Sequence, residues 1–438
     1  MHNDHVISHA VRLDVQKCKG CTACIKHCPT EAIRVKNGKA QILSENCIDC
    51  GQCILVCPHH AKQAVFDRFE ECRDRYEYCV ALPAPTLYGQ FNNLDDVNYV
   101  LNGLLEIGFD DVFEVAAAAE IVTDHTCRLI REGRLTTPVI SSACPAVVRL
   151  IRVRFPSLCD HVMPVIAPVH LAAKLARERA MEKTGLSADK IGIFFISPCP
   201  AKVTDVNEPI GIEKSEIDHV ISIKDVYVPL VKAMPNIKHL RPLEQSGLLG
   251  IGWSTSGGEA AAVHSEKFLA ADGIDNVIGI LEQLDNELLQ DLTFVELNAC
   301  TGGCVGGALT IENPFVAKAR IKRVRRNMEL YSANEGKKLP PDEYLDWQVP
   351  LGSFSTDTGD SGFSDAVQKI IRINHLAQEF PGIDCGACGA PKCRTLAEDI
   401  VNNRAEHTDC PFVLNRVLES ERDEDGRQQG EDSAHDNT

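Results

Sequence analysis

The middle of the chain alternates short apolar runs with longer amphipathic stretches. The apolar runs predict buried β-strands at residues 79–82, 112–115, 139–140 and 191–196. Between them, the stretch 169–184 carries Leu171, Leu175 and Met181 near helical spacing, which predicts an amphipathic helix. Strands that alternate with helices indicate parallel sheets with helices on their faces. The pattern therefore predicts an α/β fold, in which ligands gather at the carboxyl ends of the strands.

The two ends of the chain have different patterns. Near the N-terminus, residues 32–35 and 40–43 predict two short strands on either side of a turn at 36–38. Residues 334–363 are rich in Gly, Pro, Ser and Asp, which predicts a linker with little structure. After this linker, residues 365–379 predict an amphipathic helix.

Length and charge narrow the class of protein. The 438 residues are enough for about three domains. The formal net charge of −17 argues against nucleic acid as a partner, because basic surfaces bind phosphates. No stretch approaches the roughly 20 apolar residues of a membrane span. The first residues lack the basic and apolar segments of a secretory signal, so we expect a cytoplasmic protein without a membrane span.

Twenty cysteines are the main chemical feature of the chain, and eight of them form a repeat. The run C-x-x-C-x-x-C-x-x-x-C-P occurs at Cys18, Cys21, Cys24 and Cys28 and again at Cys47, Cys50, Cys53 and Cys57. Three cysteines at such intervals can bind one iron–sulfur cube while the fourth reaches a second cube, as in two-cluster ferredoxins. The expected ligand sets are therefore Cys18, Cys21, Cys24 and Cys57 for one [4Fe–4S] cluster and Cys47, Cys50, Cys53 and Cys28 for the other. A structural zinc site is the weaker alternative.

Four more cysteines lie in the middle of the chain, each at or just past a strand-like run. They are Cys144, Cys199, Cys300 and Cys304. Glycines surround the last two, which lets the backbone approach a bulky inorganic group closely. Thiolates from three separate segments can hold one cube once the domain has folded. Spacing alone leaves open that these are ordinary buried cysteines.

The C-terminal part holds a third group of cysteines, at Cys385, Cys388, Cys393 and Cys410. A lone C-x-x-C pair is also typical of thioredoxin-like redox sites. The two further cysteines, one at the start of a helix and one before a proline, favour a further [4Fe–4S] cluster instead. The four cysteines left over are expected to be buried or incidental thiols: Cys72, Cys79, Cys127 and Cys159.

The three central cysteine segments resemble the three signature motifs of the [FeFe]-hydrogenase large subunit, in the same order. They read Ser141-Ser142-Ala143-Cys144-Pro145, Ser197-Pro198-Cys199-Pro200-Ala201-Lys202 and Asn298-Ala299-Cys300-Thr301-Gly302-Gly303-Cys304. The resemblance implies a [4Fe–4S] cluster on the four cysteines, with Cys304 bridging to a two-iron unit that carries CO, cyanide and a dithiolate. It implies that Lys202 donates to an iron-bound cyanide and that Ala84-Pro85-Thr86 lines the two-iron unit. The implied catalytic residues are Cys304, Lys202, Cys199, Ala84 and Pro85.

The sequence also departs from that family. In the hydrogen-turnover enzymes a cysteine that relays protons precedes the first cluster cysteine, and Ala143 stands there in this chain. Family methionines that pack on the two-iron unit are replaced by Ser197 and Asn298. Glu120 and Asp124 are only loose candidates for the acidic relay. This combination resembles the sensory branch of the family, which binds hydrogen or turns it over slowly.

The regions outside the central part complete the resemblance. The N-terminal repeat is the family's usual accessory module, and the C-terminal cysteines resemble the small four-cysteine module of Rnf-type electron-transport subunits and corrinoid proteins. The expected domains are a two-cluster ferredoxin-type α+β domain at 1–68, a two-lobed parallel α/β hydrogenase-like domain at 69–335, a linker at 336–363, a helical four-cysteine module at 364–425 and an acidic disordered tail at 426–438.

We therefore expect an iron–sulfur oxidoreductase resembling a sensory [FeFe]-hydrogenase, with H2 and protons as its substrates. Electrons would pass to a redox partner protein or a separate signalling output protein. The stretch 318–326 carries six basic residues, which form either a solvated helix face or a docking site for an acidic partner. The alternatives are a non-catalytic cluster-assembly protein without the two-iron unit and an electron-transfer subunit of a larger complex.

Overall fold

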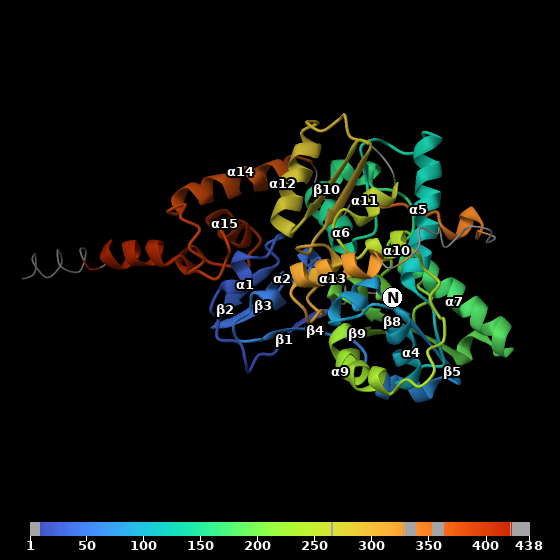
Figure 1. Cartoon of the computed structure of the whole chain (residues 1–438). Coiled ribbons are helices and arrows are strands. Elements are labelled where there is room, and N and C mark those ends of the chain that lie inside the picture. The colour runs from blue at the N-terminus through green and yellow to red at the C-terminus, as the bar shows by residue number, and fades with distance from the viewer. Residues whose placement is uncertain are drawn as a thin grey trace, which may run out of the picture. The chain divides into compact units, whose positions relative to one another are not determined.

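A computed structural model describes residues 9–263, 266–326, 328, 339–352, 363–420 and 422. They form two compact units, and most of their helices and strands are labelled in Figure 1. The first unit takes in residues 9–12, Ile48–Gly51 and 63–352, and the second takes in Leu13–Cys47, Gln52–Lys62 and the described residues from 363 onward. Most of the N-terminal repeat and the described part of the C-terminal module thus belong to the second unit, and the predicted division into separate domains stays a prediction.

The first unit contains a four-stranded parallel sheet in the order β6-β5-β8-β9. Its strands are β5 (Tyr78–Pro83), β6 (Asp111–Val112), β8 (Ile191–Ser197) and β9 (His219–Ser222). Every residue of β8 is buried, as expected for a central parallel strand with both faces covered. The strand predicted at 112–115 is shorter than expected, because helix α5 already begins at Val115.

A second parallel sheet in the same unit has the order β10-β11-β7. Its strands are β7 (Val139–Ile140), β10 (Phe268–Asp272) and β11 (Phe294–Asn298). The two sheets confirm the predicted parallel α/β architecture with two lobes.

Eleven α-helices are described in this unit. They are α3 (Phe69–Cys72), α4 (Asn98–Glu106), α5 (Val115–Arg131), α6 (Pro145–Arg154), α7 (Pro168–Thr184), α8 (Pro200–Asn207), α9 (Ile223–Ala233), α10 (Leu248–Gly252), α11 (Gly258–Val263), α12 (Ile274–Asp285) and α13 (Pro314–Arg326). Helix α7 agrees with the predicted one and packs against β5 and β8. Its buried face is built from Leu171 and alanines such as Ala176, while Met181 is exposed. Because alanine side chains are small, they let the helix lie close to the sheet. A prediction based only on large apolar residues does not identify this alanine face.

The cysteine-repeat part of the second unit is small and contains short elements. The hairpin of β2 (Ile33–Lys36) and β3 (Lys39–Ile42) is antiparallel. Strands β1 (Val11–Leu13) and β4 (Lys62–Ala64), which pair with each other, each include residues of both units. Helices α1 (Ala23–Lys26) and α2 (Gln52–Leu55) carry cysteines of the two runs. The turn residues Asn37 and Gly38 both have positive φ, at 51° and 70°, as tight two-residue hairpin turns require.

The C-terminal part of the second unit is helical, with α14 (Phe363–Glu379) and α15 (Cys393–Val401). Its small core contains Phe380, Leu396 and Cys410, against which Ile373 and Leu376 of α14 pack. Not all of the predicted apolar face of α14 is covered: Ile370 and Ile371 are exposed.

Residues 339–352 differ from the predicted linker, because they pack on the first unit. Leu345 is buried, and its carbonyl accepts a hydrogen bond from the Ile166 N–H at 2.8 Å. Tyr344 and Trp347 pack against the same core. Burial of these large side chains fixes the segment on the core, although the residues around them favour turns. The rest of the predicted linker, except residue 363, and the tail at 426–438 lie outside the described residues.

In the described part of the chain, no helix has the length and apolar character needed to cross a membrane.

Candidate metal centre

Three strands of the first unit end at turns that carry cysteines. Cys144 follows β7, Cys199 follows β8, and Cys300 follows β11. Cys144 and Cys199 each occupy the N-cap position of a helix whose first residue is proline. Cys304 comes last, at the start of a 3₁₀ turn.

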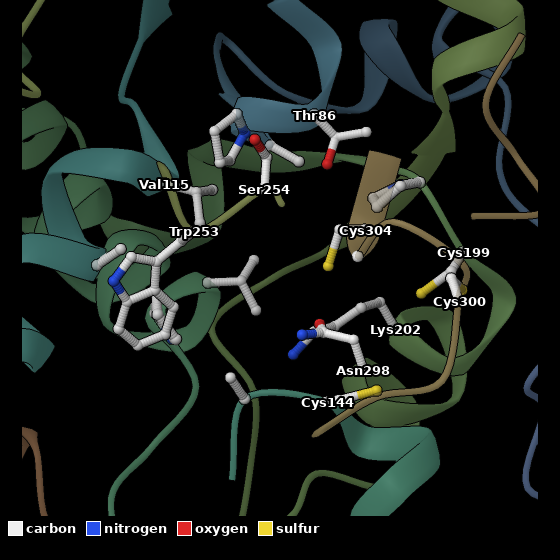
Figure 2. Close-up of a pocket in the computed structure, with 18 of the residues that line it drawn as sticks. Thr86, Val115, Cys144, Cys199, Lys202, Trp253, Ser254, Asn298, Cys300 and Cys304 are labelled. Carbon is white, nitrogen blue, oxygen red and sulfur yellow. The ribbon is translucent and has the colours of Figure 1, made fainter. Parts of the chain in front are cut away.

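These turns converge on one cavity, which encloses about 880 Å³ including its open mouth. Figure 2 shows the four cysteines on one side of it, around Lys202 and Asn298, with Trp253 on the other side. The predicted site residues that line the cavity are Ala84, Pro85, Thr86, Ala143, Cys144, Cys199, Lys202, Asn298, Cys300 and Cys304. The structure thus brings the three segments together, while the role of each residue as a ligand stays a prediction.

The thiols of this cavity lie in surroundings that disfavour thiolates. Burial raises the pKa of the Cys199 thiol to about 11, and the neighbouring Cys144 adds to the shift. Burial also raises the pKa of the Cys300 and Cys304 thiols, with further contributions from Cys199 and Cys144. Several buried thiolates repel one another unless a cation lies between them. Because a bound metal ion deprotonates its thiol ligands, this group is suited to hold a metal cluster.

Lys202 is held at the cavity wall by a buried carboxylate. Its Nζ lies 3.2 Å from Asp205 Oδ2, and His170 Nε2 lies 3.2 Å from the same oxygen. Burial opposes the negative charge of Asp205, but Lys202 and His170 outweigh it and hold the pKa of Asp205 well below its ordinary value. A fixed ammonium that faces the cavity can donate to an anionic ligand there.

Two buried glutamates of the cavity wall were not predicted from the sequence. Glu259 lies in the first turn of α11 and accepts a hydrogen bond from Ser141 Oγ at 2.6 Å, and Glu296 lies on β11. Burial, followed by the charge of Glu296, raises the pKa of Glu259 to about 8. Burial also raises the pKa of Glu296, although the N–H groups of Ala260 and Gly257 counteract it. Burial and the neighbouring Glu296 thus favour the protonated form of Glu259, which can hold a proton beside the cavity.

Two oxygens of the wall point to a polar occupant. Among the described residues, Thr86 Oγ1 and Glu259 Oε1 are buried without a hydrogen-bond partner, and both residues line the cavity. A buried polar atom without a partner costs about 1–3 kcal/mol, so such atoms point to a missing ligand or water. Four thiols, an ammonium and two such oxygens fit a [4Fe–4S] cluster with an attached group that carries polar ligands.

The three positions that the sequence analysis singled out as departures, Ala143, Ser197 and Asn298, lie in or near this cavity. Ala143 presents a methyl group to it, and the Asn298 side-chain amide donates to Glu296 Oε1 at 2.7 Å. Ser197 is buried but does not line the cavity, and its hydroxyl donates to the Cys199 carbonyl at 3.0 Å.

The two loose candidates for an acidic relay do not line the cavity. Glu120 is buried, and its Oε1 accepts hydrogen bonds from the N–H groups of Gly247 and Gly250 at 3.0 and 2.9 Å. Asp124 lies exposed on α5. Glu120 therefore fixes the loop before α10, and the carboxyl groups at the cavity are Glu259 and Glu296.

The backbone at Gly303 lies close to the backbone at Thr255 and Ser256. Gly303 has φ +93°, and a Cβ atom there would lie 2.4 Å from the Ser256 nitrogen. The turn at Ser256-Gly257-Gly258 is thus packed against the segment that carries Cys300 and Cys304.

In the second unit, one predicted ligand set surrounds a single pocket. Cys18, Cys21, Cys24 and Cys57 all line it, which is the crossed arrangement expected from the repeat. Burial raises the pKa of the Cys24 thiol, with Lys62 counteracting the shift. Of the other set, Cys50 belongs to the first unit and Cys28, Cys47 and Cys53 belong to the second, so their joint ligation stays a prediction.

The C-terminal cysteines gather around the core of their module. Cys410 is buried, and burial raises the pKa of Cys388, to which Cys410 and Cys385 add. Cys393 begins α15, and its N–H donates to Asp384 at 2.7 Å.

The four left-over cysteines lie elsewhere in the first unit. Burial raises the pKa of each of them, namely Cys72, Cys79, Cys127 and Cys159. None of the four lines the cavity.

Three regions of the chain match known families. Residues 77–264 match the family described as iron only hydrogenase large subunit, C-terminal domain. Residues 10–58 match a 4Fe-4S dicluster domain, and residues 380–412 match a putative Fe-S cluster module.

Similar proteins include hydrogenases and a probable Fe-S cluster assembly factor. The chain is 25% identical to the NADP-reducing hydrogenase subunit HndD of Solidesulfovibrio fructosivorans, over 76% of this chain and 69% of that protein. It is also 25% identical to iron hydrogenase 1 of Clostridium pasteurianum, over 75% and 70%. A solved structure of a variant of [FeFe]-hydrogenase HydA1 from Chlamydomonas reinhardtii aligns with a TM-score of 0.46 and 16% identity, over 63% of this chain and 95% of that one. A probable cytosolic Fe-S cluster assembly factor of Drosophila sechellia is 24% identical over 59% of this chain and 62% of that protein.

The cysteine sites and the sequence matches indicate an iron–sulfur protein that is similar to iron-only hydrogenases. Residues 77–264 resemble the C-terminal domain of the iron only hydrogenase large subunit, and the regions before and after them resemble two iron–sulfur modules. It is thus related to the [FeFe]-hydrogenases, at low sequence identity.

Proposed function

We propose that the chain is a sensory-type [FeFe]-hydrogenase that binds H2 or turns it over slowly, according to H2 ⇌ 2H⁺ + 2e⁻. The observation that carries the proposal is the cavity in which four thiols, Lys202 and two unpartnered oxygens face one space. Cys144, Cys199, Cys300 and Cys304 would hold a [4Fe–4S] cluster, and Cys304 would also bridge to a two-iron unit. Ala84, Pro85 and Thr86 would line that unit.

The residues of the chain would orient the occupant and handle protons. When bound, a two-iron unit supplies the site at which H2 is split heterolytically. Lys202, held by Asp205, places a positive charge at the wall where an anionic ligand such as cyanide would lie. Glu259 can take or give a proton at Oε1, while Ser141 holds Oε2.

Ala143 would limit the rate. A methyl group cannot carry a proton, and the loss of a positioned acid or base typically costs about 10²–10⁴ in rate. A slow enzyme with an intact binding cavity suits a protein that reports hydrogen rather than consumes it.

Electrons would leave through the cysteine modules. The N-terminal repeat would hold two [4Fe–4S] clusters and the C-terminal module one, leading to a redox partner or a signalling output protein in the cytoplasm. Helix α13 is a candidate docking surface for an acidic partner, because it carries six basic residues. Two of them pair within the chain, Arg320 with Glu312 and Arg323 with Asp95.

A non-catalytic iron–sulfur protein is the second candidate. The match to a probable cluster assembly factor and the absence of a relay thiol at Ala143 favour it. Such a protein would keep the cluster on the four central cysteines and lack the two-iron unit.

Hydrogen turnover with a matched pair of variants tests the proposal. Ala143→Cys restores a thiol at the cavity, whereas Ala146→Cys makes the same change at a buried position that does not line the cavity. After maturation with the two-iron unit, we expect slow H2-dependent dye reduction by the natural chain. Ala143→Cys should be at least about tenfold faster, and Ala146→Cys should be unchanged. Absence of turnover and of H2/D2 exchange at full metal loading would refute the function, and equal rates in the two variants would refute the role of Ala143.

A further inference from the structure

The C-terminal module makes a buried ion pair with the N-terminal cysteine repeat, within the second unit. Asp399 of α15 receives a bidentate pair of hydrogen bonds from the Arg34 guanidinium of β2, with Nη2 lying 3.2 Å from Oδ1. The side chains of Arg34 and Asp399 are only 7% and 3% exposed. A lone buried charge of either kind is costly, so the pair ties the two parts together.

Further polar contacts surround this ion pair. Glu31 pairs with Lys392 at 2.7 Å and accepts a hydrogen bond from the Thr395 hydroxyl. Burial works against the charge of Glu31, but hydrogen bonds from Lys392 and Thr395 lower its pKa. On the other side, Arg404 bridges Asp399 and Glu45 at 3.4 and 3.3 Å.

The contact reaches both cysteine sites through one residue. Val35 lines the pocket of Cys18, Cys21, Cys24 and Cys57, and its N–H donates to the Gly389 carbonyl at 2.9 Å. Gly389 directly follows Cys388 in the chain. A single strand residue therefore separates the pocket of the first ligand set from the loop of the C-terminal cysteines.

Gly389 fits this place because it lacks a side chain. Its φ is +86°, and a Cβ atom there would lie 1.9 Å from the Val35 carbonyl oxygen. The loop therefore lies directly on the outer edge of β2, whose opposite edge pairs with β3. An edge strand covered in this way is also protected from pairing with other chains.

We infer that the C-terminal module is a fixed electron relay that exchanges electrons directly with the cluster on Cys18, Cys21, Cys24 and Cys57. One electron leaves a reduced cluster and reduces the other, and no bond forms or breaks. Arg34 and Asp399 are positioning residues, and Val35 and Gly389 are the point of closest contact. The inference rests on the proposed function only in requiring the two clusters, and it needs neither the two-iron unit nor hydrogen.

A matched pair of glycine variants of the full chain tests the inference. Gly389→Ala places a methyl group against Val35, whereas Gly382→Ala carries a similar positive φ, of 69°, with nothing within 4 Å. The two changes share backbone strain and differ in the contact. Hydrogen–deuterium exchange of the iron-loaded chain reports whether the Val35 amide is protected. Electron paramagnetic resonance of the dithionite-reduced chain reports magnetic coupling between the clusters.

We expect the Val35 amide of the natural chain and of Gly382→Ala to be protected, and Gly389→Ala to exchange it at least about tenfold faster. Gly389→Ala should also lose the magnetic coupling between the two clusters at unchanged iron content. An unprotected Val35 amide in the iron-loaded natural chain would overturn the inference, whether or not the variant binds its clusters. Equal exchange and coupling in the two variants would overturn it as well. Failure of hydrogen turnover alone would refute the proposed function and leave these results standing.

Discussion

The ion pair that holds Lys202 can be weakened by Asp205→Asn, which keeps the shape of the side chain and removes its charge. Asp205 is only 2% exposed and contacts both Lys202 and His170. Breaking a buried ion pair by changing one partner typically costs about 3–5 kcal/mol. With a urea dependence of about 3 kcal/mol per molar, the unfolding midpoint should fall by roughly 1 M or more.

Tryptophan fluorescence during urea unfolding of the iron-free chain measures this effect, because both tryptophans, Trp253 and Trp347, lie in the first unit. Glu77→Gln is the control, since its pair with Lys190 is exposed and worth about 0–1 kcal/mol. The pKa of Asp205 is lowered in the folded state, so its stabilisation is full above the ordinary value of 3.8 and is lost as the pH falls toward the lowered pKa. The reasoning would be refuted if the two variants unfolded within about 0.5 kcal/mol of each other at pH 7.

Three further changes test other parts of the account. Glu259→Gln should lower turnover by about 10²–10⁴-fold with unchanged iron content, and an unchanged rate would exclude Glu259 from proton transfer. Cys410→Ser should remove about four iron atoms per chain while the other clusters stay, and an unaltered iron analysis would contradict the C-terminal cluster. Gly303→Ala should lower the free energy of unfolding of the first unit by more than about 1 kcal/mol. Its control is Gly279→Ala, in a helix with open space around the glycine, which should raise that free energy by about 0.5–1 kcal/mol. Urea unfolding in which Gly303→Ala is the more stable variant would contradict the packing.

Patterns of local origin could be predicted from the sequence. The strands at 79–82, 139–140 and 191–196 correspond to β5, β7 and β8, because buried parallel strands are continuous apolar runs. Cys144 and Cys300 follow β7 and β11, which are neighbours in one parallel sheet and end at the same edge. Cys199 follows β8 of the other sheet, so only the resemblance to the hydrogenase motifs indicated that it would join them.

Pairings between distant segments could not be predicted. Arg34 and Asp399 are 365 positions apart, and nothing in the periodicity around either residue indicates a buried partner. Glu259 lies on the short helix α11 directly after two glycines, and its raised pKa comes from burial and from Glu296 on another element. The burial of Leu345 and the packing of Trp347 could not be predicted, because the residues around them are mostly of turn-forming types.

Infrared spectroscopy of the full chain after maturation with the two-iron unit is the most direct measurement of the central claim. Iron-bound CO and cyanide absorb in a region that is free of protein bands. If the cavity around Cys304 and Lys202 holds the two-iron unit, both kinds of band will be present, and Lys202→Met will shift or abolish the cyanide bands. A spectrum without either kind of band, from protein whose [4Fe–4S] clusters are complete, would show that the cavity does not hold that unit.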